Sequence, residues 1–194
     1  MIGARVLCGV GVAAVALVPA AGDRSAPAPR TVRVAVTSPA GAAELATGFA
    51  AGRDRVVTVA HVLDAGGTVT VDGRRARVLR VDRRDDLALL AVRGVPGAGV
   101  RTVPGAAGNV RLLLRSTARP ARIRRAITAT VRIEPSPPVR RPALDLAADV
   151  APGDSGAPVV DANGRIAGVV FATSSAHAHT AYAVDATALA ALLR

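Results

Sequence analysis

The chain has 194 residues, which is enough for one domain or for two small half-domains that share an interface. Hydrophobic residues make up 51% of the sequence but aromatic residues only 2%, so a core would consist of valine, alanine, leucine and isoleucine. The formal net charge is +11, and every basic residue is an arginine. These arginines are scattered along the sequence, and so few aromatic residues leave no platform for stacking bases, which argues against specific nucleic-acid binding.

Residues 1–21 have the features of an export signal. Arg5 gives a positive start, and the uncharged run over residues 6–21 is shorter than the ~20 residues that span a bilayer comfortably. Residues 18–20 (VPA) resemble the small-residue pattern before a signal peptidase cut. We therefore expect a cleaved signal peptide and a secreted or cell-envelope protein, with an uncleaved N-terminal membrane anchor as the alternative.

Residues 22–30 are polar and contain prolines, which is typical of a flexible linker. The only cysteine, Cys8, precedes this linker, so the domain that follows cannot contain an internal disulfide. Its stability has to come from its core, or from its core and a bound ligand.

From residue 31 onward, short valine-rich segments alternate with turn residues, as in an all-β protein. Asp72-Gly73 and Asn163-Gly164 are typical hairpin turns. The pattern predicts strands at residues 31–37, 46–51, 55–59, 68–71, 76–81, 87–92, 110–115, 121–133, 143–148, 157–160, 166–173 and 181–184.

A stretch rich in glycine and proline, residues 94–108, divides these strands into two groups of about six. We therefore expect two six-stranded antiparallel β-barrels within one domain over residues 31–194. The first barrel would cover about residues 31–100 and the second about 108–184. Asp185 can accept hydrogen bonds from exposed N–H groups and so cap a short C-terminal helix over about residues 185–193.

Three chemically active side chains, a histidine, an aspartate and a serine, occur in this order along the chain. His61 follows one apolar strand segment, Asp86 opens another, and Ser155 lies in the turn sequence Gly-Asp-Ser-Gly. The histidine and the aspartate fall in the first half of the chain and the serine in the second. An active site between the two barrels would bring the three together.

A serine hydroxyl is a weak nucleophile at neutral pH and needs a neighbouring base to take its proton as it attacks. His61 can take that proton and later return it to a leaving amine. A buried Asp86 would hold the imidazole in the correct tautomer and stabilise the imidazolium. Asp85 is the rival acid, but we expect its carboxylate to be solvated.

Gly153 and Gly156 lack a Cβ, so the turn around Ser155 can adopt conformations that are barred to other residues. Such a turn can direct the N–H groups of Gly153 and Ser155 to the point where a substrate carbonyl oxygen becomes negative. Each feature alone has an ordinary interpretation: a packed histidine, an acid before a strand, or a simple turn. Together and in this order, they predict a catalytic triad of His61, Asp86 and Ser155.

Five segments of the sequence resemble those of bacterial trypsin-like peptidases, the group that holds HtrA-type and actinobacterial cell-envelope serine proteases. They are residues 47–49 (TGF), 58–61 (TVAH), 86–90 (DLALL), 153–156 (GDSG) and 163–170 (NGRIAGVV). The resemblance covers about residues 31–193. It implies a double β-barrel, hydrolysis of peptide bonds in protein or peptide substrates, and neither a metal nor an organic cofactor. No PDZ-like segment follows Leu193, so regulation by a PDZ domain is not expected.

Activation departs from the family pattern, whereas the expectation for specificity follows from the family's spacing. No Ile-Val-Gly-Gly-like start follows a basic cut site, so Asp154 would need local N–H partners instead of a new N-terminus. By the family's spacing, Asp149 would lie at the base of the primary pocket and favour arginine or lysine in the substrate; a solvated or arginine-paired loop acid is the alternative. Phe171, Ala172 and Thr173 would form the wall along which a substrate strand adds, unless that strand end only fills the barrel.

Two other functions stay open at this point. A catalytically silent protein of this fold could bind peptides or envelope partners without cutting them. A basic barrel protein could instead bind an anionic envelope polymer, with an affinity that falls steeply with salt.

Overall fold

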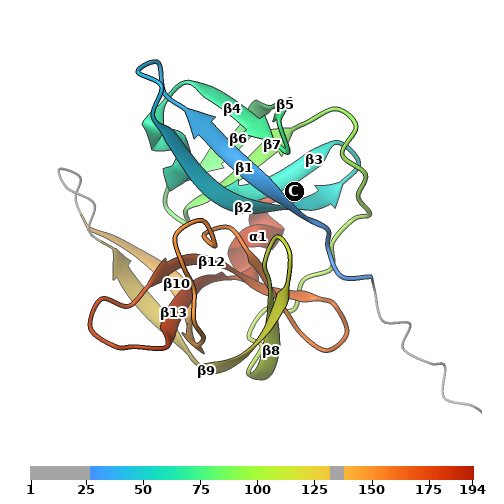
Figure 1. The fold of residues 1–194 in the computed structure, drawn as a ribbon. Coiled ribbons are helices and arrows are strands. Elements are labelled where there is room, and N and C mark those ends of the chain that lie inside the picture. The colour runs from blue at the N-terminus through green and yellow to red at the C-terminus, as the bar shows by residue number, and fades with distance from the viewer. Residues whose placement is uncertain (1–26, 132–137) are drawn as a thin grey trace, which may run out of the picture.

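The computed structural model describes residues 27–131 and 138–194, which fold almost entirely into β-structure (Figure 1). The signal peptide expected over residues 1–21, and residues 22–26 of the expected linker, lie outside the described residues. Within the two described ranges, no helix is long and apolar enough to cross a membrane.

Seven strands form the first sheet, in the order β5-β4-β1-β2-β3-β7-β6. They are β1 (Thr31–Thr37), β2 (Ala43–Gly52), β3 (Arg55–Val59), β4 (Thr68–Val71), β5 (Arg74–Arg75), β6 (Arg77–Asp82) and β7 (Leu87–Ala91). Strand β1 illustrates why this sequence forms a half-buried sheet, because Val32, Val34 and Val36 alternate with polar or small residues and are buried on one face.

Six strands form the second sheet, which closes into a barrel in the order β10-β13-β12-β11-β8-β9. They are β8 (Gly108–Leu113), β9 (Ala118–Val131), β10 (Val139–Ala147), β11 (Pro158–Val160), β12 (Ile166–Thr173) and β13 (Thr180–Asp185). Its interior is filled by small and branched residues such as Leu112, Leu144, Leu146, Val159 and Ala183, all fully buried.

The expected trypsin-like double barrel is confirmed, but the strand count differs in the first half. The first sheet is curled (Figure 1), and it contains the additional strand β5, which pairs Arg75 with Thr70 of β4. Strands β5 and β6 form the two edges of this sheet, and the strand pairing does not continue between them. The sequence pattern misses β5 because two exposed arginines show no alternation of apolar and polar residues.

The chain ends in helix α1 (Ala186–Leu192), which lies between the two sheets (Figure 1). As expected, Asp185 caps it, since its Oδ1 accepts from the Thr187 N–H at 2.8 Å. Leu189 and Leu192 belong to a hydrophobic cluster that also contains residues of both sheets. Arg80 of β6 donates to the Leu192 carbonyl at 2.7 Å, which fastens the end of the helix to the first sheet.

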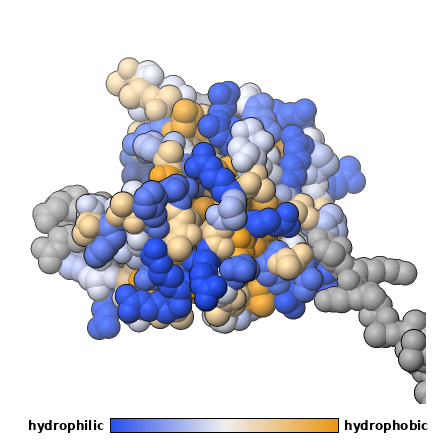
Figure 2. Space-filling model, turned by 60° about the horizontal axis from the view of Figure 1, so that its bottom comes forward, coloured by the Kyte–Doolittle hydropathy of each residue, from blue (hydrophilic) through white to orange (hydrophobic). Residues whose placement is uncertain are grey.

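Figure 2 turns the second barrel toward the viewer, and hydrophilic side chains cover most of this face, with small apolar patches between them. In the second barrel part of the positive charge is compensated locally, because Arg124 and Arg125 of β9 both bind the Asp145 carboxylate, at 3.1 and 3.2 Å. Arg119 and Arg122 lie on the same strand and are exposed.

Candidate active site

His61 and Asp86 meet because β3 and β7 pair in a register that places Val59 opposite Leu87. The residues just beyond these strand ends are therefore neighbours. The Ala60 N–H donates to the Asp86 carbonyl at 3.1 Å, and a short 3-10 helix, His61–Ala65, then begins. The structure thus brings together the first two residues of the expected triad.

The Asp86 carboxylate holds His61 at two points. Its Oδ1 accepts from the backbone N–H of His61 at 2.8 Å, and its Oδ2 lies 2.8 Å from the ring Nδ1. The Asp86 side chain is only 8% exposed, whereas that of His61 is 34% exposed. When Nδ1 carries the proton of this bond, Nε2 is left as the basic nitrogen.

Burial alone lowers the pKa of His61, but the hydrogen bond and the negative charge of Asp86 outweigh it. The more distant charges of Asp64 and Glu44 act in the same direction as Asp86. The pKa of His61 is therefore raised above its ordinary range, so the site stabilises an imidazolium.

Asp85, the rival acid, does not bind the imidazole. Among the described residues, the hydrogen bonds of His61 go to Asp86 and none goes to Asp85. The side chain of Asp85 is less solvated than expected, because its Oδ1 is shielded from solvent and has no hydrogen-bond partner there. Burial and the neighbouring Asp82 raise the pKa of Asp85, against the opposing charges of Arg84 and Arg141.

Ser155 lies in the loop of residues 151–157 between β10 and β11, here called the nucleophile loop. Gly153 and Gly156 have φ angles of 93° and 89°, a region that favours glycine. A Cβ on Gly156 would also come within 1.9 Å of the carbonyl oxygen of Thr47, a residue of β2. The loop therefore needs glycine at position 156 both for its backbone angle and for its approach to the first sheet.

Thr47 fastens the nucleophile loop to the first sheet. Its N–H donates to the Ser155 carbonyl and its Oγ1 to the Gly153 carbonyl, both at 2.8 Å. Its own carbonyl accepts from Thr58 Oγ1 at 2.8 Å, and Thr58 lies in β3, which leads to His61. The backbone of the serine and the histidine are thus attached to the same junction between the sheets. Thr47 and Thr58 are fully buried, and sequence reasoning assigned neither a role.

The N–H groups of the nucleophile loop divide into two sets. Those of Asp154, Gly156 and Ala157 donate to the carbonyls of Ala151, Val170 and Asp154, respectively. Those of Gly153 and Ser155, the two expected oxyanion donors, make no hydrogen bond within the described part of the chain.

Asp154 has the local partner that it was expected to need, because its Oδ2 accepts from the Ala151 N–H at 2.9 Å. Within residues 27–131 and 138–194, no hydrogen bond joins Ser155 Oγ to His61. Such bonds are often long without substrate and tighten only when it binds.

Comparison with known proteins decides the family. A family model described as a trypsin-like peptidase domain matches residues 46–169, which include His61, Asp86 and Ser155. The chain belongs to the trypsin-like peptidase family. Two curated relatives, the serine proteases MT3772 and Rv3671c of two Mycobacterium tuberculosis strains, are each 36% identical over 162 residues. The matched region is 76% of this chain and 41% of the relative, so the chain spans about two fifths of their length.

Solved structures agree with this assignment. The active form of the Rv3671c protease from M. tuberculosis superimposes with a TM-score of 0.77 at 35% identity, covering 85% of this chain and 79% of that one. An inactive form of the same protease gives a TM-score of 0.68 at 35% identity, covering 83% and 86%. The HtrA-type protease AlgW with a tripeptide shares the fold, with a TM-score of 0.65 at 21% identity, covering 88% and 60%.

In this trypsin-like domain Asp149 is exposed and paired. Its Oδ1 lies 2.7 Å from Nδ1 of His179, at the end of the loop between β12 and β13. Arg119 donates to the Asp149 carbonyl at 3.4 Å rather than to the carboxylate. The sequence left a solvated or an arginine-paired acid as the alternative; the Asp149 side chain is 67% exposed, and its carboxylate binds a histidine.

Residues 171–173 lie at the end of β12. On one side, Ala172 and Thr173 pair with β13, and a register shift leaves Phe171 as a bulge. On the other side, the ladder with β11 ends at Val169, so in the described structure the main chain of residues 171–173 has no strand neighbour there. The side chain of Phe171 is buried, with its ring centroid 6.5 Å from that of Tyr182.

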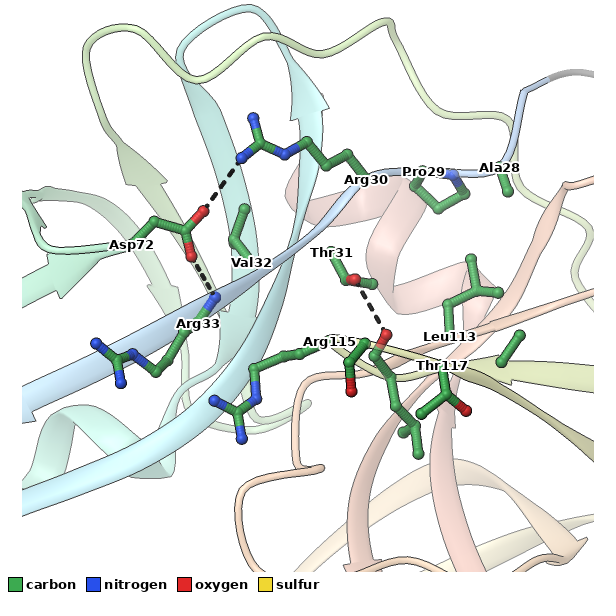
Figure 3. A pocket seen from close by; sticks show the side chains of 13 residues that line it. Ala28, Pro29, Arg30, Thr31, Val32, Arg33, Asp72, Leu113, Arg115 and Thr117 are labelled. Carbon is green, nitrogen blue, oxygen red and sulfur yellow. Dashed lines mark hydrogen bonds and ion pairs between the residues drawn. The ribbon is translucent and has the colours of Figure 1, made fainter.

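An open groove of ≈ 970 Å³ lies away from the three candidate catalytic residues of the trypsin-like domain, between residues 28–33 and 113–118 (Figure 3). Asp72 accepts there from the Arg33 N–H at 2.9 Å and from the Arg30 side chain at 3.3 Å. Thr31 Oγ1 donates to the Leu114 carbonyl at 3.2 Å. These bonds attach the entering N-terminal segment to both sheets.

In the part of the chain that the structure describes, no three histidine, cysteine, aspartate or glutamate side chains gather as ligands for a metal ion.

Proposed function

We propose that this chain is a serine endopeptidase that hydrolyses peptide bonds with His61, Asp86 and Ser155 through an acyl-enzyme. The main support is that Asp86 binds His61 at two points and that the Gly153 and Ser155 N–H groups of the nucleophile loop make no hydrogen bond within the described residues. These are the groups that the reaction needs: an oriented base and two donors for a developing oxyanion.

The proposed reaction begins when Nε2 of His61 takes the proton of Ser155 Oγ, which attacks the carbonyl carbon of the peptide bond. Asp86 stabilises the imidazolium, and the N–H groups of Gly153 and Ser155 bind the oxygen that becomes negative. The tetrahedral intermediate collapses as the C–N bond breaks, and the imidazolium returns its proton to the leaving amine. Water, activated by the same imidazole, then hydrolyses the ester and restores Ser155.

The comparisons support a serine peptidase, because the two curated relatives, each 36% identical to this chain, are serine proteases.

We propose that the unpaired edge of residues 171–173 receives the substrate as an added strand through main-chain hydrogen bonds. Asp149 is proposed as an acidic determinant of the primary pocket. Its pairing with His179 implies that a basic substrate side chain would have to compete with an imidazole for the carboxylate. A preference for arginine or lysine should therefore be modest and should strengthen when His179 is replaced.

The proposal is tested by labelling the purified chain with a fluorophosphonate probe, which reacts with an activated serine. We expect labelling of the wild type and none of Ser155→Ala, with strong loss in His61→Ala. Ser174→Ala is the matched control, because this serine lies beyond β12, outside the nucleophile loop. A folded wild-type chain that is not labelled and does not cleave a peptide library would contradict the enzyme.

The silent peptide binder and the anionic-polymer binder make different predictions. The first would release no products and would bind peptides equally well in the wild type and in Ser155→Ala. The second would bind an anionic polymer with an affinity that falls with salt and ignores Ser155→Ala. Its support is the net charge of +11.

We also propose that the segment before the domain exports the protein and either is removed or attaches it to a membrane. Sequencing the N-terminus of the protein recovered from an expressing bacterium separates the two. A start after about residue 20 indicates cleavage.

A further inference from the structure

Arg141 is the least expected residue at this site. It lies in β10 of the second barrel, between exposed Arg140 and Pro142, yet its own side chain is only 2% exposed. The guanidinium points toward the first sheet, with Nη1 3.4 Å from Asp86 Oδ2. Its central carbon lies 5.2 Å from the ring centroid of Phe171, a distance at which a cation is attracted to an aromatic face.

A buried guanidinium needs an opposite charge, because removing it from water without one is very costly. Asp86 is the carboxylate with which Arg141 forms an ion pair. The contact is electrostatic rather than a bidentate fork, since Nε and Nη1 of Arg141 are buried and make no hydrogen bond within the described residues. The oxygen that Arg141 approaches is the same Oδ2 that lies 2.8 Å from Nδ1 of His61.

Other charges also act on this cluster. The negative charges of Asp86, Asp64 and Glu44 all favour protonation of His61. Asp85 lies near Arg141, and the charges of Arg141, Arg84 and Asp82 all influence the pKa of its carboxyl. Arg141 is the cation that lies in direct contact with the Asp86 carboxylate.

Resting on the proposed protease function, we propose that Arg141 is a positioning residue that fixes the Asp86 carboxylate and shares its Oδ2 with His61. A residue of the second barrel thereby positions the proposed base, His61, which belongs to the first half of the chain. Two effects follow. The guanidinium limits the rotation of the carboxylate, so Oδ2 stays directed at the imidazole. Its positive charge also offsets part of the attraction between Asp86 and a protonated His61. His61 therefore stays neutral, and able to act as a base, down to a lower pH than it would with Asp86 alone.

The two effects are separated by three variants. Arg141→Met removes the charge and keeps much of the volume, Arg141→Lys keeps the charge without the planar guanidinium, and Arg140→Met is the exposed control one residue away. Each is assayed for kcat/KM across pH with a peptide that the wild type cleaves. The titration of the His61 ring is followed by NMR in the same variants carrying Ser155→Ala, so this readout does not require activity.

In Arg141→Met we expect the acidic limb of kcat/KM and the His61 titration to move up by about one pH unit. Below that limb, kcat/KM would fall about tenfold relative to the wild type. In Arg141→Lys the limb should stay within about 0.3 pH unit of the wild type, while the plateau kcat falls through looser positioning of Asp86. Arg140→Met should match the wild type in both measurements.

A folded Arg141→Met chain whose His61 titration is unchanged would overturn the proposal, whatever its activity. A shifted His61 titration in Arg141→Met, with no peptide cleavage by the wild type or by any variant, would refute the protease function but keep the effect of Arg141 on His61. If Arg141→Met does not fold, Arg141→Gln gives the same test, and a shift equal in Arg141→Lys and Arg141→Gln would refute a role for the charge.

Discussion

Thr47 offers the sharpest test of how the first sheet positions the nucleophile loop. Thr47→Val has nearly the same shape as threonine and loses only the Oγ1 bond to the Gly153 carbonyl, which is 2.8 Å long. The two main-chain bonds of residue 47, to the Ser155 carbonyl and from Thr58 Oγ1, stay in place. The change therefore isolates one hydrogen bond between the barrels.

The size of the effect follows from that single bond. A neutral hydrogen bond contributes about 1 kcal/mol net, which corresponds to a Tm lower by about 2–4 °C in a protein of this size. If the whole contribution serves to hold Gly153 in its present conformation, the equilibrium constant between the competent loop and its other conformations falls about fivefold, and kcat falls by at most that factor. This is much smaller than the ~10²–10³ expected for complete loss of an oxyanion donor.

The assay is kcat and KM for a peptide ester, with the fraction of competent sites counted by an active-site titrant. Thr47→Ser is the matched control, because it keeps the hydroxyl and should stay within about twofold of the wild type. A wild-type kcat together with a wild-type Tm in Thr47→Val would show that the bond does not position the loop. An equal loss in both variants would assign the effect to packing of the methyl group.

Three further outcomes can be measured on the same protein. Gly156→Ala should cost more than about 3 kcal/mol or prevent folding, since its Cβ would lie 1.9 Å from the Thr47 carbonyl oxygen. Gly41→Ala, at φ 85° with open space around it, should cost only about 1 kcal/mol in chemical denaturation. Because the folded state raises the pKa of His61, protonation of this residue stabilises the fold below the pKa of the unfolded chain, and this contribution disappears as pH rises through the folded pKa. His61→Asn should therefore lose more unfolding free energy at about pH 5 than at about pH 9, and an equal loss would contradict the shift. Asp149→Asn should reduce cleavage after arginine relative to leucine, and an unchanged ratio would remove Asp149 from the pocket.

The sequence was most informative where chemistry and local conformation coincide. His61 and Asp86 could be predicted as a pair because each follows or opens a strand in a recognisable segment, and the pairing of β3 with β7 places them side by side. The alternation of valine predicted β1 residue for residue, and the Asn163-Gly164 turn lies between β11 and β12 as expected.

What the sequence could not reveal depends on contacts between distant segments. Thr47 and Gly153 are 106 positions apart, and their bond exists only because the two sheets face each other in one particular way. Arg141 received no role from the sequence, because nothing in its neighbours signals that its side chain is buried against Asp86. The partner of Asp149 was likewise hidden, since His179 is 30 positions away in an exposed loop.

The hydrophobic cluster that runs from the first sheet through Leu189 of the last helix into the second sheet has a consequence for unfolding. The described region contains no cysteine, so no disulfide within it can keep one half folded while the other unfolds. Heat or denaturant should therefore dismantle both halves in a single cooperative transition. The proposed triad takes His61 and Asp86 from the first half and Ser155 from the second, so a partly unfolded molecule that still cleaves peptides should not accumulate.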